Sequence, residues 1–198
     1  ESMCVPILDD NNQMIGALGI NRDITARKEE SERLHNRAHY DELTQLPNRY
    51  LLLDRLTHLI EHSKHNKSTF ALFFIDLDKF KTINDTKGHT FGDKVLKEVA
   101  SRLSHSIRKT DTMARIGGDE FILLFENTSD PEEISKMAEM LIKVISEDLN
   151  IDDNKVQISC SIGIATYPKS GTTTDALLLN ADDHMYKAKS NKRGTYQF

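Results

Sequence analysis

The stretch that decides the fold is residues 113–125, MARIGGDEFILLF. Two mostly apolar runs flank the pair Gly117-Gly118. Two such runs joined by a short glycine turn are typical of an antiparallel hairpin. Because Asp119 and Glu120 follow the glycines directly, the sequence puts two carboxylates next to the turn.

Helical and extended patterns alternate on both sides of this hairpin. Apolar residues at helical spacing predict helices over 48–65, 90–107, 132–149 and 175–189. Apolar runs bounded by turn residues predict strands over 69–75, 113–116, 121–125, 156–166 and 195–198. Such an order predicts an α/β (α+β) sandwich, with a mixed central sheet and flanking helices.

The composition excludes several classes of protein. The chain has 198 residues and a formal net charge of −5, which argues against nucleic acid as a partner. No apolar run approaches the ~20 residues of a membrane-spanning helix, so we expect no membrane contact within this stretch. Cys4 and Cys160 lie far apart and indicate a reducing compartment, so we expect a cytoplasmic location. Because the chain begins with Glu1, we expect a piece of a longer protein that could be anchored elsewhere.

The first 40 residues differ from the rest. Apolar runs at Met3–Leu8 and Met14–Ile20 flank turn residues and predict a hairpin. Two strands are not stable alone, so they either end a truncated domain or pack on the body of the protein. Residues 24–40 are highly charged with a thin apolar stripe. They predict either a connector helix that pairs with a second copy or a plain solvated helix.

Two pairs of carboxylates are candidates for chemistry. Asp76 and Asp78 follow an apolar strand and point the same way, so they either cap the next helix or hold a hard cation. Asp119 and Glu120 either are solvated at the hairpin or face a substrate. If strand 69–75 lies beside the hairpin, Asp76 and Asp119 could share one Mg²⁺, which suits phosphoryl or nucleotidyl transfer.

Residues 79–93, KFKTINDTKGHTFGD, suit a purine nucleotide. Asparagine and aspartate can bind the edge of a base, and lysine can meet phosphate. The segment lacks the GxxxxGK[ST] pattern of a P-loop. A basic cluster near the C-terminus is either a cation-rich helix end or a triphosphate clamp. It consists of Lys187, Lys189, Lys192 and Arg193.

These motifs together resemble the GGDEF domains, the diguanylate cyclases. Residues 115–121, RIGGDEF, match the signature of that family, and residues 41–49, DELTQLPNR, resemble its opening motif. Further matches are residues 76–81, 84–85, 88–93, 161–165 and 186–189. The resemblance covers about residues 40–198, and several motifs in order make it specific. It implies the palm-like α/β sandwich shared with class III nucleotide cyclases.

The resemblance also implies a role for each matching residue. The implied ligands of Mg²⁺ (or Mn²⁺) are Asp76, the Leu77 carbonyl, Asp119 and Glu120. The implied catalytic residues are Asp119, Glu120 and Lys81, one of the two carboxylates helping to deprotonate a ribose 3′-hydroxyl. The implied substrate-binding residues are Phe80, Asn84, His89, Asp93, Gly117, Gly118, Lys189 and Arg193. The family commonly has Gly before and Asn after this arginine, where this chain has Lys192 and Gly194.

The reaction implied joins two GTP into cyclic di-GMP and releases two pyrophosphates. Since each domain holds one GTP, the resemblance implies a homodimer. Residues 108–111, RKTD, resemble the RxxD site at which product inhibits the family, which assigns Arg108 and Asp111 to that site and Arg115 to the same surface. The alternative is a catalytically silent module that binds GTP or cyclic di-GMP and regulates a neighbouring domain.

The expected division of the chain has three parts. Residues 19–25, GINRDIT, resemble the exit motif of a PAS sensor domain, so residues 1–23 are expected to be the C-terminal remnant of one. Residues 24–40 are expected to form a signalling helix, and residues 41–198 the GGDEF domain.

Overall fold

The computed structural model describes residues 2–21, 23–25, 37–128 and 130–198. The chain divides into two compact units, Glu1–Ala38 and His39–Phe198. In the first unit, β1 (Ser2–Leu8) pairs antiparallel with β2 (Met14–Asn21), which confirms the predicted hairpin. The predicted helix over 24–40 falls largely outside the described residues.

The second unit is built on a five-stranded sheet in the order β4-β5-β3-β8-β9. Its strands are β3 (Phe70–Asp78), β4 (Thr112–Gly117), β5 (Glu120–Glu126), β8 (Ser159–Tyr167) and β9 (Tyr196–Gln197). All neighbours are antiparallel except β8 and β9, which are parallel, so the sheet is mixed as predicted. A separate ribbon joins β6 (Leu149–Ile151) to β7 (Asn154–Val156).

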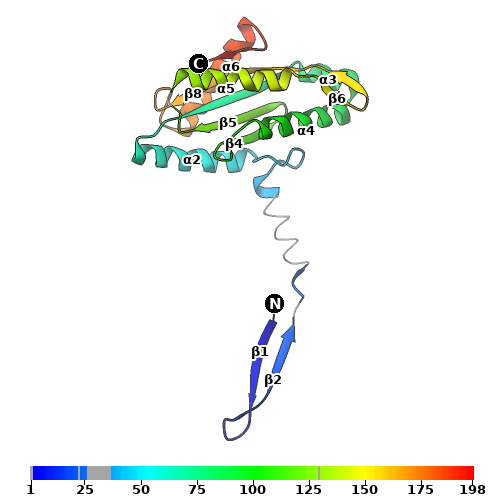
Figure 1. The fold of residues 1–198 in the computed structure, drawn as a ribbon, viewed down its shortest axis with the longest axis vertical. Helices are drawn as coiled ribbons and strands as arrows, with labels where there is room; N and C mark the ends of the chain where they lie inside the picture. Colours follow the sequence, from blue (N-terminus) through cyan, green and yellow to red (C-terminus); the bar gives the residue numbers. More distant parts are fainter. Residues whose placement is uncertain (1, 22, 26–36, 129) are drawn as a thin grey trace. The chain divides into compact units, whose positions relative to one another are not determined.

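Helices cover both faces of this sheet (Figure 1). They are α2 (Arg49–Asn66), α3 (Phe80–Lys87), α4 (His89–His105), α5 (Pro131–Ser146) and α6 (Thr174–Asn191). Alternate residues of a strand face opposite sides. Accordingly, Phe73 and Ile75 of β3 pack in a core with α4 and α5, whereas Leu72 and Phe74 pack in a second core with α2 and α6. The predicted sandwich is therefore correct.

Three helices begin at the polar residues expected of helix starts. The side chains of Asn48, Asp130 and Thr173 each accept a hydrogen bond from a backbone N–H in the first turn of α2, α5 and α6. In the described part of the chain, no helix is both long and apolar enough to span a bilayer.

The structure corrects several predicted boundaries. Strand β3 continues through Asp78, three residues beyond its predicted end, because the neighbouring strand β8 pairs with it that far. The predicted strand over 156–166 is broken at residues 157–158, and the predicted helix over 132–149 ends early because Leu149 begins β6. Helix α3 was not predicted as a separate element.

The hairpin turn is also shifted by one residue. Gly117 pairs with Glu120, so the two turn residues are Gly118 and Asp119 rather than the two glycines. An irregularity between Arg115 and Gly117 shifts the register of β4 against β5. Both glycines have positive φ, 152° and 50°, a conformation that side chains with a Cβ rarely adopt. Asp119 therefore lies within the turn itself.

Candidate active site

The two pairs of carboxylates meet at one end of the sheet. Strand β3 lies beside β5, as the shared-cation hypothesis required, and Asp76 is the direct neighbour of Glu120 in that register. The backbone N–H of Leu77 donates to the carbonyl of Asp119 at 3.2 Å, which ties the hairpin turn to the end of β3. The fold therefore brings Asp76, Asp119 and Glu120 together.

These carboxylates influence each other's protonation. The pKa of Asp76 is raised, chiefly by burial and also by the charges of Asp119 and Asp78, although a hydrogen bond from Lys189 opposes the rise. The pKa of Glu120 is raised by burial first and then by the charges of Asp76 and Asp119. Lys189, from α6, pairs with Asp76 at 2.7 Å, so a cation already sits against this negative cluster.

The donor chemistry of this cluster fits Mg²⁺. That ion prefers oxygen ligands and is commonly held by one or two carboxylates together with substrate phosphates. Within the described residues, no group of three or more His, Cys, Asp or Glu side chains forms a ready-made metal site. Asp76 and Asp119 would supply the protein's carboxylates, and substrate oxygens would have to complete the shell.

Asp78 has a different task from Asp76. It accepts hydrogen bonds from the hydroxyls of Ser159 and Ser161 at 2.7 and 2.8 Å and from the backbone N–H of Gly194 at 3.1 Å. The helix-cap interpretation is wrong for both carboxylates, because Lys79 occupies the N-cap of α3 and no side chain caps that helix. Asp78 instead holds the C-terminal loop against the sheet.

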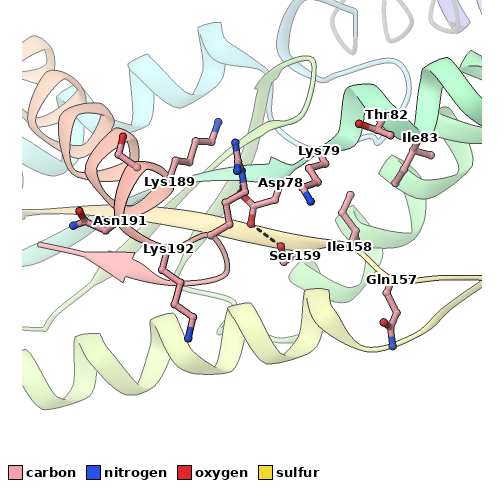
Figure 2. A pocket seen from close by; sticks show the side chains of 12 residues that line it. Asp78, Lys79, Thr82, Ile83, Gln157, Ile158, Ser159, Lys189, Asn191 and Lys192 are labelled. Atoms are coloured by element: carbon pink, nitrogen blue, oxygen red, sulfur yellow. Dashed lines mark hydrogen bonds and ion pairs between the residues drawn. The ribbon is translucent and has the colours of Figure 1, made fainter.

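A cavity of about 560 Å³ opens beside Asp78 (Figure 2). Its cationic lining comes from Lys79 after β3 and from Lys189, Lys192 and Arg193 at the end of α6. The Arg193 guanidinium lies 3.9 Å from Asp78 and its side chain is 56% exposed. Gly194 has a positive φ of 74°, so the residue that follows Arg193 here adopts a turn suited to glycine. Phosphate groups would meet four flexible cations there.

The residues predicted to bind the base lie on the neighbouring helices α3 and α4. Asn84 is on α3, and His89 and Asp93 are exposed on the first turns of α4. The Asn84 Oδ1 atom is buried and has no hydrogen-bond partner, an arrangement that is costly in the absence of a ligand. Phe80 is 6% exposed and packs in the core beneath, so it supports these helices.

Gly92 lies in the matching segment 88–93, but sequence reasoning gave it no role. A Cβ atom at this position would lie 3.0 Å from Asn84 Cγ and 3.2 Å from Phe80 Cζ, and would overlap Asn84 Oδ1. Only glycine therefore allows the Asn84 amide to lie where it does. The Gly-Asp pair at positions 92–93 was visible in the sequence, but its steric role needs the helix–helix contact.

Arg115, in β4, contacts the hairpin turn between β4 and β5. Its guanidinium donates twice to the Gly118 carbonyl, at 3.0 and 2.8 Å, and pairs with Asp41 at 2.8 Å. The Arg115 side chain is only 10% exposed. Asp41 also accepts from the N–H and hydroxyl of Thr44. This arrangement links the segment before α2 to the turn that carries Asp119, which the sequence did not indicate.

The predicted product site holds a structured turn. The Asp111 carboxylate accepts from the backbone N–H groups of Arg108 at 3.0 Å and Glu126 at 3.3 Å, and it is 8% exposed. The Arg108 guanidinium pairs with Glu133 at 2.9 Å and lies over the ring of Phe125. Arg108 is 59% exposed and so is open to a ligand.

Known proteins share this architecture. The family described as "Diguanylate cyclase, GGDEF domain" matches residues 38–195. The bifunctional diguanylate cyclase/cyclic di-GMP phosphodiesterase MucR of Pseudomonas aeruginosa is 48% identical over 159 residues, which are 80% of this chain and 23% of MucR. The chain thus spans about a quarter of the length of that relative.

Two solved structures show the same fold. The GGDEF domain of TpbB from Pseudomonas aeruginosa is 38% identical with a TM-score of 0.78, covering 80% of this chain and 93% of that one. The coiled coil and GGDEF domain of DgcB from Caulobacter crescentus, in complex with c-di-GMP, is 26% identical with a TM-score of 0.78. That likeness covers 87% of this chain and 92% of the DgcB chain.

Proposed function

Because this chain belongs to the GGDEF family of diguanylate cyclases, we propose that it condenses two GTP into cyclic di-GMP and two pyrophosphates, with Mg²⁺ (or Mn²⁺) and as a homodimer. The observation that carries the proposal is the meeting of Asp76, Asp119 and Glu120 beside the lysine- and arginine-lined cavity. Carboxylates next to a cationic cavity suit nucleotidyl transfer.

The residues divide the work of binding between base and phosphates. Asn84, His89 and Asp93 recognise guanine, and the buried Oδ1 of Asn84 gains a donor from the base. Lys81, Lys189 and Arg193 neutralise the triphosphate, and Gly117 and Gly118 let it approach the backbone of the hairpin. Each domain thereby holds one GTP.

Two carboxylates and one carbonyl would hold the metal. Asp76, Asp119 and the Leu77 carbonyl would bind Mg²⁺, which neutralises charge that develops on the phosphates. Lys189 would then leave Asp76 and turn to the phosphates, since it lines both sites. This exchange would move one cation from the carboxylate cluster to the substrate.

Glu120 is the candidate base for each bond-forming step. It is the direct neighbour of Asp76 across the sheet, next to the carboxylates that would hold the metal, and a carboxylate placed there can accept a proton. The 3′-hydroxyl of one GTP gives up its proton, and its oxygen attacks the α-phosphorus of the other. The bond from that phosphorus to the bridging oxygen breaks and pyrophosphate leaves; the second bond forms in the same way.

We assign product inhibition to Arg108, with Asp111 holding the turn that presents it. A charged, exposed guanidinium suits a phosphodiester. Arg115 was expected on the same surface, but its contacts with Asp41 and Gly118 favour a role in positioning the catalytic turn.

The test is to incubate the protein with GTP and Mg²⁺ and to separate the products by chromatography. We expect cyclic di-GMP from the parent protein and none from Asp119→Asn, which keeps the shape of the side chain but loses its charge. Arg108→Ala should turn over at the parent rate initially and escape inhibition by added product. GTP binding without any product would favour the silent regulatory module instead, and product from Asp119→Asn would remove that residue from the mechanism.

A further inference from the structure

Glu133 is a carboxylate that the proposed reaction does not use and that lies against the inhibitory arginine. It is in the first turn of α5. Its Oε1 atom accepts a hydrogen bond from Nη2 of Arg108 at 2.9 Å. In the part of the chain that the structure describes, no other carboxylate forms an ion pair with Arg108. The guanidinium assigned to the product phosphate is therefore already paired with an anion of the protein.

The position of the Glu133 carboxylate does not depend on Arg108 alone. Its second oxygen, Oε2, accepts a hydrogen bond from the hydroxyl of Thr128 at 2.8 Å. Thr128 is buried and fixed to the residue before β3, because its N–H donates to the Thr69 carbonyl and its own carbonyl accepts from the Thr69 hydroxyl. The pKa of Glu133 is lowered, first by the hydrogen bond from Thr128 and then by Arg108. A charged carboxylate would thus stay beside Arg108 when a ligand arrives.

Arg108 has supports other than Glu133. The Asp111 carboxylate accepts from the backbone N–H of Arg108 at 3.0 Å. The guanidinium carbon lies 5.2 Å from the centroid of the Phe125 ring, and a cation over an aromatic face is attracted to it. The arginine would therefore keep its place over the ring without Glu133, so the ion pair is not needed to position it.

Three other charged groups lie near this turn. Lys109, Asp111 and Glu126 line a cavity together with residues of α2, whereas Glu133 belongs to α5. Asp111 is bound to two backbone N–H groups. The pKa of Glu126 is raised, first by burial and then by the charge of Asp111. Of the carboxylates around the turn, Glu133 is thus the one that bears on the Arg108 guanidinium directly.

We propose that Glu133 weakens product inhibition, because its carboxylate competes with the phosphate of cyclic di-GMP for the Arg108 guanidinium. The inference rests on the proposed function, since it assumes that cyclic di-GMP binds at Arg108. A phosphodiester is an anion, so at this site it meets the attraction of Arg108 and the repulsion of Glu133 together. Glu133 thereby sets the product concentration at which inhibition begins.

The test is calorimetric titration of cyclic di-GMP, without GTP, into the parent, Glu133→Gln, Arg108→Ala and the double variant. Glutamine keeps the shape of the side chain and can still accept from Thr128, but it has no charge. We expect Glu133→Gln to bind cyclic di-GMP about three- to fivefold more tightly, near the upper end of what an exposed ion pair contributes. If Glu133 acts through Arg108, the double variant should bind no more tightly than Arg108→Ala alone.

Glu132→Gln is the matched control. Glu132 lies in the same turn of α5 and pairs with Lys136 rather than with Arg108. The same loss of charge there should leave the affinity for cyclic di-GMP at the parent value. Equal tightening in both variants would overturn the proposal, because net charge rather than the contact with Arg108 would then be the cause.

A turnover assay separates this inference from the proposed function. The cyclic di-GMP concentration that halves the rate, relative to each protein's own rate without added product, should fall about three- to fivefold in Glu133→Gln. No turnover in the parent, together with tighter binding by Glu133→Gln, would overturn the proposed reaction and keep the role of Glu133. Turnover in the parent, with binding by Glu133→Gln that is unchanged or weaker, would overturn that role alone. A parent that does not bind cyclic di-GMP would overturn it as well, because there would be no affinity to tune.

Discussion

Replacing Gly92 by alanine should weaken GTP binding through Asn84 while leaving the fold intact. The new methyl group would lie 3.0 Å from Asn84 Cγ and overlap Oδ1. Since carbon atoms prefer separations of about 3.5–4.0 Å, Cγ must retreat by roughly 0.5–1 Å, and the overlapping Oδ1 atom must move further or rotate away. The flexible amide gives way more easily than the backbone of either helix.

The size of the effect follows from the contact that is lost. Losing a hydrogen bond and leaving a polar group of the base unpaired costs about 1.5–3 kcal/mol, which corresponds to roughly 10- to 100-fold weaker GTP binding. Alanine in a helix is favoured over glycine by about 1 kcal/mol, which offsets the crowding, so the unfolding midpoint should change little.

Calorimetric titration with GTP on four proteins tests this reasoning. These are the parent, Gly92→Ala, Asn84→Ala and the double variant. If Gly92 acts through Asn84, the double variant should bind GTP no more weakly than Asn84→Ala alone. Gly19→Ala, whose Cβ would meet nothing within 4 Å, is the matched control. Parent-like binding by Gly92→Ala, or losses that simply add, would refute the steric argument.

Three further predictions concern stability and reactivity. Gly163→Ala would overlap the backbone of α6 and should lower the free energy of unfolding by about 3 kcal/mol or more, measured by urea denaturation; a cost under 1 kcal/mol would contradict the close helix–sheet contact. Burial raises the pKa of the Cys160 thiol, so in a Cys4→Ser background a thiol reagent at pH 8 should react only after unfolding. Burial raises the pKa of Asp41, but its hydrogen bonds, including that from Arg115, outweigh burial and leave the pKa below its ordinary value. The ionised Asp41 therefore stabilises the folded state above about pH 4, and this contribution is lost as pH falls through the folded pKa. Asp41→Asn should accordingly cost about 2 kcal/mol at pH 7 and much less at pH 3, and an equal cost at both would contradict the ion pair.

The elements of the fold could be predicted because local patterns and tertiary packing agree. The run Phe70–Ile75 is wholly apolar, and such a strand must be covered on both faces. Where prediction failed, the decisive contact was not local. Asp78 stays in β3 because the hydroxyls of Ser159 and Ser161 in β8 donate hydrogen bonds to its carboxylate, and those residues are more than 80 positions away.

The sequence indicated candidate residues for the site but not the contacts between them. Asp76 and Asp119 followed from a strand end and a glycine turn. In contrast, the Lys189–Asp76 pair depends on how α6 crosses the sheet, and the Asp41–Arg115 pair joins residues 74 positions apart. Such pairings depend on the packing of whole elements, so residue spacing carries no signal for them.

The most direct test of the central claim is the rate of cyclic di-GMP formation per subunit over a wide range of protein concentration, at saturating GTP and Mg²⁺. If the bonds form between nucleotides held by two copies, the rate per subunit should rise with concentration and level off once dimers dominate. A rate per subunit that stays constant down to concentrations at which sedimentation shows only monomers would contradict the account.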